Sequence, residues 1–176
     1  MPSDAIEVAD ADPAWPAQYA EEVEAIRHAL GSHGAALQFE HIGSTAVPGL
    51  AAKPIIDVLL IPPDGEWPDE IIRTTLERLG YVSWDSNPNP RHLFFVKGMP
   101  PFGACRTHHV HVRPRADAIP ILAFRDRLRT QPESAGAYER LKRELAARYP
   151  TDREAYTHGK DAFVSAVLSG IDAPAT

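Results

Sequence analysis

Apolar side chains recur at helical spacing near the start of the chain and again through its last third. Near the start they fall three or four residues apart, which is the spacing of one helix face, and this predicts a helix over residues 14–30. The glycine at position 31 supplies its stop. Similar patterns, punctuated by proline and glycine, predict four more helices. These cover residues 68–79, 119–129, 132–148 and 152–168.

Strand patterns occupy the middle of the sequence. Residues 54–61 are rich in β-branched side chains and apolar on both faces, as in a central strand, and Asp57 is their only charge. Because strands and helices come first and helices alone follow, we expect one α+β domain over residues 1–176, in which helices pack on a small mixed β-sheet and the C-terminal third is helical. The other predicted strands cover residues 36–42, 81–84, 92–97 and 107–113, with a turn over 86–90.

The composition excludes several classes of protein. The 176 residues carry 18 Lys and Arg against 24 Asp and Glu, a net charge of −6, which leaves no broad basic surface for duplex nucleic acid. Apolar runs are far shorter than the roughly 20 residues of a membrane span, and the N-terminus lacks the order of a secretory signal. One cysteine, Cys105, excludes an internal disulfide and fits a reducing compartment. We therefore expect a cytoplasmic protein that binds neither a membrane nor duplex nucleic acid, while its oligomeric state stays open.

The segment over residues 40–57 carries the first candidate chemistry. Gly43 allows the backbone to approach a ligand closely, and Ser44 and Thr45 offer hydroxyl and backbone N–H groups, a combination suited to phosphate. A turn and capping role for the same residues is the alternative. Asp57 follows in an apolar strand, where a carboxylate must be hydrogen-bonded, bind a cation or have a raised pKa. It either holds a cation or ties down the preceding loop, and the pattern alone leaves both open.

Two histidines on one strand supply further candidates. In residues 107–113, alternation places His109, His111 and Arg113 on the face opposite the core. With Asp57, the two imidazoles could coordinate a metal, act as acid and base, contact phosphate, or simply make ordinary hydrogen bonds. Glu40 or His41 from the neighbouring strand could join them. A set of imidazole and carboxylate ligands favours Mn²⁺, Zn²⁺ or Fe²⁺ over pure Mg²⁺ chemistry.

The order of residues 41–57 resembles the signature of the GrpB family, and residues 107–112 are similar to its second motif. The C-terminal segment from Phe124 to Lys160 is also similar, so the likeness spans nearly the whole chain. The resemblance implies a nucleotidyltransferase-like fold of the polymerase-β type, in which a Gly-Ser turn contacts nucleotide phosphates and strand carboxylates hold a divalent metal ion such as Mg²⁺ or Mn²⁺. Family members occur alone or joined to dephospho-coenzyme A kinase.

One position departs from the pattern that the resemblance implies. Active nucleotidyltransferases typically place a second acidic residue two positions after the first, but here Leu59 follows Asp57. Two-metal phosphoryl transfer needs several hard oxygen ligands, and leucine supplies none. Either other side chains complete the site, or the protein binds a phosphorylated ligand without transferring anything.

Positive charge for such a ligand has several sources in the sequence. Lys53 lies next to the candidate loop, and Lys160 shares a helical stripe with apolar residues, from which it reaches either the ligand's phosphates or water. Lys142 interleaves with acidic residues, which is typical of a solvated, salt-bridged helix face. Other candidates are Arg91, Lys97, Arg106 and Arg113.

Three functional hypotheses follow. In the first, a nucleotide or related phosphorylated small molecule binds through Gly43, Ser44 and Lys53, and Asp57 with histidine help holds the ion for nucleotidyl transfer to a small acceptor. The second is a non-catalytic module that binds a nucleotide or coenzyme. The third is a metal-dependent enzyme of another class that uses Asp57, His109 and His111.

Overall fold

The computed structural model describes residues 5–64, 69–84, 89 and 91–170. Strands and helices are mixed up to residue 112, and helices alone follow. Short 3₁₀ turns, η1 (Gly31–Ala36) and η2 (Ser44–Ala46), precede and follow the first strand. The helices are α1 (Trp15–Leu30), α2 (Asp69–Arg78), α3 (Arg115–Thr130), α4 (Pro132–Arg148), α5 (Arg153–His158) and α6 (Asp161–Leu168). The strands are β1 (Gln38–Ile42), β2 (Ile56–Ile61), β3 (Tyr81–Ser83), β4 (Leu93–Lys97) and β5 (His108–Val112).

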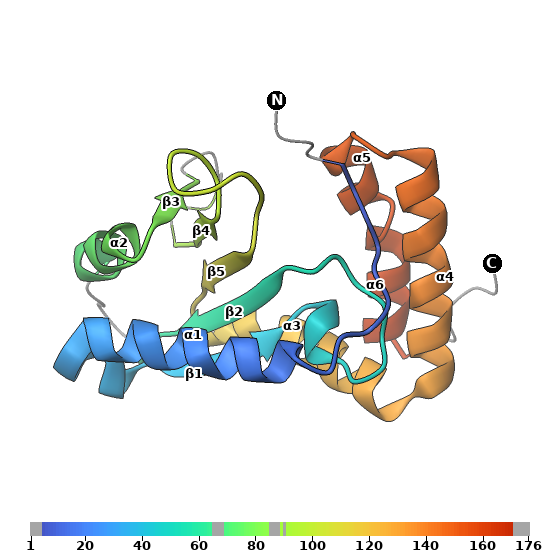
Figure 1. Ribbon diagram of the computed structural model, residues 1–176. Helices are drawn as coiled ribbons and strands as arrows, with labels where there is room; N and C mark the ends of the chain where they lie inside the picture. The colour runs from blue at the N-terminus through green and yellow to red at the C-terminus, as the bar shows by residue number, and fades with distance from the viewer. Residues whose placement is uncertain (1–4, 65–68, 85–88, 90, 171–176) are drawn as a thin grey trace.

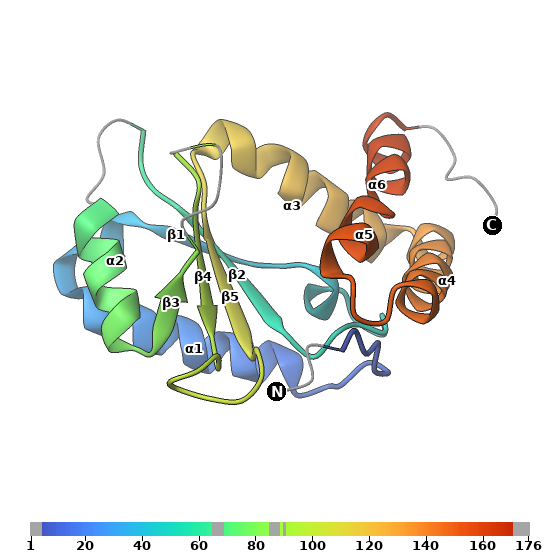
Figure 2. The same cartoon turned by 90° about the horizontal axis from the view of Figure 1, so that it is seen from above.

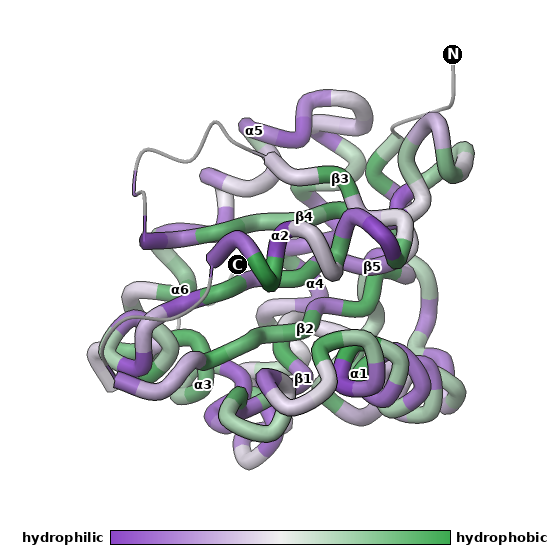
Figure 3. Tube along the Cα trace, turned by 90° about the vertical axis from the view of Figure 1, so that its left-hand side faces the viewer, coloured by the Kyte–Doolittle hydropathy of each residue, from purple (hydrophilic) through white to green (hydrophobic). Residues whose placement is uncertain are grey.

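The five strands form one mixed sheet in the order β1-β2-β5-β4-β3 (Figure 1). The β2–β5 pair is parallel, and the other three pairs are antiparallel. The central strand β5 and its neighbour β2 are apolar at their buried positions, and Figure 3 shows hydrophobic residues along the middle of the sheet. The predicted α+β class with a small mixed sheet is confirmed.

Helices cover both faces of the sheet. On one face, α1 and α2 enclose the main core, to which Val58, Leu60, Val110 and Val112 contribute. On the other face, Leu59 and Ile61 pack against α3, which Figure 2 shows on the opposite side of the strands from α1. Helices α4 and α6 pack beside α3 around a separate apolar cluster. The C-terminal helices thus stand at one end of the sheet, next to the loop between β1 and β2 (Figure 2).

Two helix boundaries differ from the sequence prediction. Helix α3 begins at Arg115, four residues before the predicted start, and continues through Pro120. The helix predicted over 152–168 is two helices, because α5 ends at His158, with Gly159 as its C-cap, and α6 begins at Asp161. Most of the turn predicted over 86–90 lies outside the described residues. Among the residues that are described, no helix has the length and apolar character to cross a membrane.

Candidate functional site

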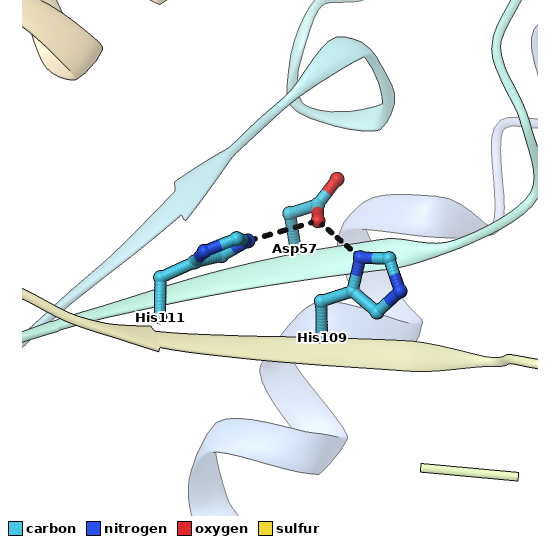
Figure 4. A group of neighbouring side chains, drawn as sticks. All are labelled: Asp57, His109 and His111. Atoms are coloured by element: carbon cyan, nitrogen blue, oxygen red, sulfur yellow. Dashed lines mark hydrogen bonds and ion pairs between the residues drawn. The ribbon is translucent and has the colours of Figure 1, made fainter. Parts of the chain in front are cut away.

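One carboxylate and two imidazoles meet on the α3 face of the sheet. The parallel register places Asp57 of β2 beside His109 of β5, and His111 follows two residues later on the same face. Asp57 Oδ1 lies 3.0 Å from His109 Nδ1 and 3.4 Å from His111 Nε2 (Figure 4). The pairing of adjacent strands therefore brings together residues that are 52 and 54 positions apart in the chain.

The geometry of these three groups fits a metal ion. One ligand atom from each residue lies within 4.8 Å of the others. Ligand atoms about 2.1 Å from an ion lie about 3.0–3.4 Å apart in octahedral or tetrahedral coordination. The two Asp57 contacts, at 3.0 and 3.4 Å, fall at those separations. The set of one carboxylate and two imidazoles suits Mn²⁺, Fe²⁺ or Zn²⁺ better than Mg²⁺.

The charges of the cluster also favour a bound cation. Burial alone would raise the pKa of Asp57, but hydrogen bonds from His109 and His111 outweigh it and hold the pKa well below its usual range. Burial lowers the pKa of His111, against the opposing influence of Asp57. A carboxylate binds a metal ion when it is ionised, and an imidazole binds one when it is neutral. The lowered pKa of Asp57 and the lowered pKa of His111 both favour these protonation states.

Leu59 occupies the position where a second acidic ligand is expected. It is 0% exposed and packs with Ile42, Ile61 and Ala118 below α3. In the sheet, Leu59 is the register partner of His111. An acidic side chain at position 59 would be buried in an apolar cluster, whereas the imidazole of His111 lies beside it and reaches Asp57. His111 of the neighbouring strand β5 thus offers a candidate ligand beside position 59, where β2 has a leucine.

Gly43 brings the loop after β1 against the Asp57 carboxylate. Its φ of 72° lies in the left-handed region, and a Cβ atom here would overlap Asp57 Oδ2. Ser44, the next residue, lines the cavity that lies over the Asp57 cluster and is described below. Thr45 also contributes to the wall, but its hydroxyl donates a 3.3 Å hydrogen bond to the Ile55 carbonyl and lies 3.1 Å from His41 Nε2. The Thr45 hydroxyl therefore anchors the loop to the two strands.

A cavity of about 420 Å³ opens over the cluster. Sheet, loop and C-terminal helices all contribute to its wall. Five cationic side chains line it, and Asp57 is the only carboxylate among the described residues that do so. The cations are Lys53, Arg106, Lys142, Arg153 and Lys160, and we call this space the basic cavity.

The lysines of the basic cavity are crowded and poorly hydrated. Lys53 Nζ and Lys160 Nζ lie 5.0 and 4.4 Å from the centroid of the Tyr156 ring. Burial, with nearby cations, lowers the pKa of Lys53 to about 8, and burial also lowers that of Lys160. Burial and the charges of Lys160 and Arg143 lower the pKa of Lys142 to about 7. An anion in the cavity would relieve the repulsion among them.

Lys142 contradicts the solvated helix face predicted from its acidic neighbours. It is 2% exposed, and its ammonium donates to the Ala51 carbonyl and lies 5.1 Å from the Tyr138 ring centroid. The signal that was available is its spacing, because Lys142 lies four residues after Tyr138 and three before Leu145, both buried residues of α4. Lys142 therefore belongs to the inward stripe of the helix, and the Glu139 beside it belongs to a neighbouring stripe.

Glu40 and His41 do not line the basic cavity. The Glu40 carboxylate accepts a 2.7 Å hydrogen bond from Arg125 Nη1. His41 faces α1 instead, where it stacks on Tyr19 with ring centroids 4.5 Å apart. Burial lowers the pKa of His41 to about 4, so the ring is neutral near pH 7. Both side chains hold neighbouring helices against β1.

Comparison with known proteins agrees with the motifs and with the fold. The profile of the GrpB protein family matches residues 5–169. The chain belongs to the GrpB family. A UPF0157 protein from Pseudomonas aeruginosa is 59% identical over 165 residues, which are 94% of this chain and 67% of that protein.

Solved structures place the GrpB chain among nucleotidyltransferase-like folds. The crystal structure of the conserved protein GrpB from Enterococcus faecalis matches with a TM-score of 0.79 and 36% identity, covering 93% of this chain and 96% of that one. The Cid1 poly(U) polymerase, in a structure with MgGTP bound, matches with a TM-score of 0.51 and 13% identity. That match covers 88% of this chain and 51% of the polymerase, and at this identity it shows the fold alone.

Proposed function

We propose that this GrpB protein binds a nucleoside triphosphate in the basic cavity and transfers its nucleotidyl group to a small-molecule acceptor. The observation that carries the proposal is the charge of the cavity, where five cationic side chains surround one carboxylate. A polyphosphate neutralises such a site, whereas a neutral or cationic substrate leaves the cations crowded against one another.

The proposed roles follow from where each side chain lies. Ser44 and the turn at Gly43 would contact the phosphate nearest Asp57, because both line the cavity beside that carboxylate. Lys53 and Lys160, which both lie close to the Tyr156 ring, would bind the outer phosphates. His109 Nδ1 would hold the ion beside Asp57, because it lies 3.0 Å from the Asp57 carboxylate.

In the transfer, a hydroxyl or amine of the acceptor attacks the α-phosphorus. The new bond to phosphorus forms while the bond from the α-phosphorus to the bridging oxygen breaks, so that pyrophosphate leaves and the acceptor's proton passes to solvent. A divalent ion held by Asp57, His109 and His111 would neutralise charge on the α-phosphate during this step. The cationic side chains would stabilise the departing pyrophosphate.

The test is pyrophosphate release from the four ribonucleoside triphosphates with Mn²⁺ or Mg²⁺, in the presence of a panel of small alcohols and amines. We expect Asp57→Asn to lower the rate at least about 10³-fold, or about 4 kcal/mol of transition-state stabilisation. His108→Gln is the matched control, because His108 lies on the same strand but contacts Glu22 on the opposite face. Equal rates in wild type and Asp57→Asn would contradict the proposal.

Leu59 supports a second candidate, a nucleotide-binding module without catalysis, because β2 supplies only one acidic ligand. In that case a triphosphate raises the melting temperature equally with and without a chelator, and no acceptor supports turnover. A metal-dependent enzyme of another class would instead retain Zn²⁺, Fe²⁺ or Mn²⁺ through purification, lose it in His109→Ala and His111→Ala, and show no response to nucleotides.

A further inference from the structure

A second cavity adjoins the basic cavity and differs from it in chemistry. Its volume is about 440 Å³, and it shares Gly43, Ser44, Asp57, His111 and Tyr138 with the basic cavity as a common wall. Its remaining wall comes mainly from apolar side chains of two helices. These are Pro120, Ile121, Phe124 and Leu128 of α3, with Val164 and Leu168 of α6. We call this space the apolar cavity.

The charged groups of the apolar cavity are already engaged by the protein. Arg125 donates to Glu40, to the His41 carbonyl and to Asp126. Arg113 donates to the carbonyls of Leu93 and Val112. The apolar cavity therefore suits an uncharged group, whereas the basic cavity suits an anion.

Both spaces have the size of small-molecule sites, which run from about 300 to 1,000 Å³. The basic cavity also carries the half-buried aromatic ring of Phe94, which a nucleotide base could contact without leaving the cavity. A triphosphate bound there leaves the apolar cavity empty, with Asp57 and His111 between the two. A group that enters from the apolar side meets the site of transfer directly.

We infer that the apolar cavity binds the acceptor, and that the acceptor is an apolar alcohol or amine whose uncharged body packs between α3 and α6. This rests on the proposed function, since an acceptor has a role only if a nucleotidyl group is transferred. The body of the acceptor is buried against Phe124, Leu128 and Val164, and its hydroxyl or amine points to the Asp57 end of the cavity. A second polyanion is excluded by the apolar wall.

The test uses 3-phenylpropan-1-ol and 3-phenylpropan-1-amine as probes, with binding followed by saturation-transfer NMR and ATP binding followed by calorimetry with Mn²⁺. Val164→Phe narrows the apolar cavity between α3 and α6, and we expect it to weaken binding of the probes at least tenfold while the affinity for ATP stays within twofold. Ser165→Phe is the matched control, because it adds an aromatic ring on the exposed face of the same helix. Leu168→Lys, at a half-exposed lining position, is a second variant that places a charge in the cavity without a buried volume change.

The outcomes separate this inference from the proposed function. Unchanged probe binding in Val164→Phe and Leu168→Lys, or no probe binding by the wild type, overturns the inference and leaves nucleotide binding intact. Equal loss of ATP and probe binding in Val164→Phe also overturns it, because the apolar cavity then holds the base of the nucleotide. Probe binding that follows the expected pattern, without any binding of ATP, supports the apolar ligand class and overturns the proposed nucleotidyl transfer.

Discussion

The two faces of the sheet each bury a carboxylate among histidine and lysine, with opposite results. On the α1 face, Glu22 is 8% exposed and accepts hydrogen bonds from Tyr81 at 2.9 Å and from Lys97 at 2.8 Å, with His108 Nε2 at 3.8 Å. One carboxylate meets one lysine there, so the charges balance within the protein. On the other face, Asp57 lines a cavity together with five lysine and arginine side chains and two imidazoles.

The difference separates a structural polar cluster from a candidate binding site. Balanced, hydrogen-bonded charges in a buried setting hold elements together, and Glu22 joins α1 to β3 and β4 in this way. Around the basic cavity, lysine and arginine side chains outnumber the one lining carboxylate, and an anionic ligand would lower the free-energy cost of that excess. Three experiments sharpen or break this comparison.

Gly43→Ala is expected to have the largest effect. Two costs add in this variant: a backbone at φ 72° is strained by about 1–2 kcal/mol for alanine, and the new methyl group overlaps the Asp57 carboxylate. We expect affinity for Mn²⁺, measured by calorimetry, to fall at least tenfold and pyrophosphate release at least about a hundredfold.

Gly49→Ala is the control that separates strain from displacement of Asp57. Gly49 has a φ of 76°, and a Cβ atom there would meet nothing within 4 Å. Gly49→Ala should lose only the stability that backbone strain costs, measured by urea unfolding, and should keep its affinity for Mn²⁺. If both variants lose the metal equally, the close approach of Gly43 to Asp57 has no specific role.

Glu22→Gln should reduce stability without affecting the site. Removing the negative charge leaves the Lys97 ammonium without its ionic partner and weakens the hydrogen bond from the Tyr81 hydroxyl. We expect this to lower the free energy of unfolding by about 2 kcal/mol. Urea unfolding measures that loss, and ATP affinity should remain within twofold. A variant that keeps full stability, or that loses nucleotide binding, would show that the α1 face is not a separate structural cluster.

Lys142→Met should change the stability of the protein by an amount that depends on pH. The pKa of Lys142 is lowered to about 7 in the folded protein, so between pH 7 and about 10 the unfolded chain binds a proton that the folded chain does not. The stability of the wild type therefore rises with pH in this window, by at most about 1.4 kcal/mol per unit, relative to Lys142→Met.

Urea unfolding at pH 6, 7.5 and 9 measures this difference. Arg140→Met is the control, because Arg140 is exposed on the same helix and stays charged throughout. If the free energies of unfolding of the wild type and Lys142→Met change in parallel with pH, burial of the Lys142 ammonium carries no free-energy cost. The basic cavity would then not differ from the Glu22 cluster in the way proposed here.

Local sequence signals predicted most of the elements and half of the site. The periodicity of α1 and the double-sided apolar pattern of β2 indicated their positions within two residues. Asp57 stood out as the one charge in an apolar strand, and alternation placed His109 and His111 on the same face of β5. These signals come from residues close together in the sequence. Backbone dihedral preferences and side-chain alternation produce them wherever the segment lies in the fold.

Long-range contacts decided the rest. That β2 and β5 are parallel neighbours, that His111 lies beside Leu59, and that Lys142 faces inward all depend on which elements pack together. Segments far apart in the chain meet only when burial of their apolar faces selects one arrangement out of many. The sequence by itself determined which residues were able to do chemistry, and tertiary packing decided which of them share one cavity, because a charge becomes a binding group only in the company and solvent exposure that the fold provides.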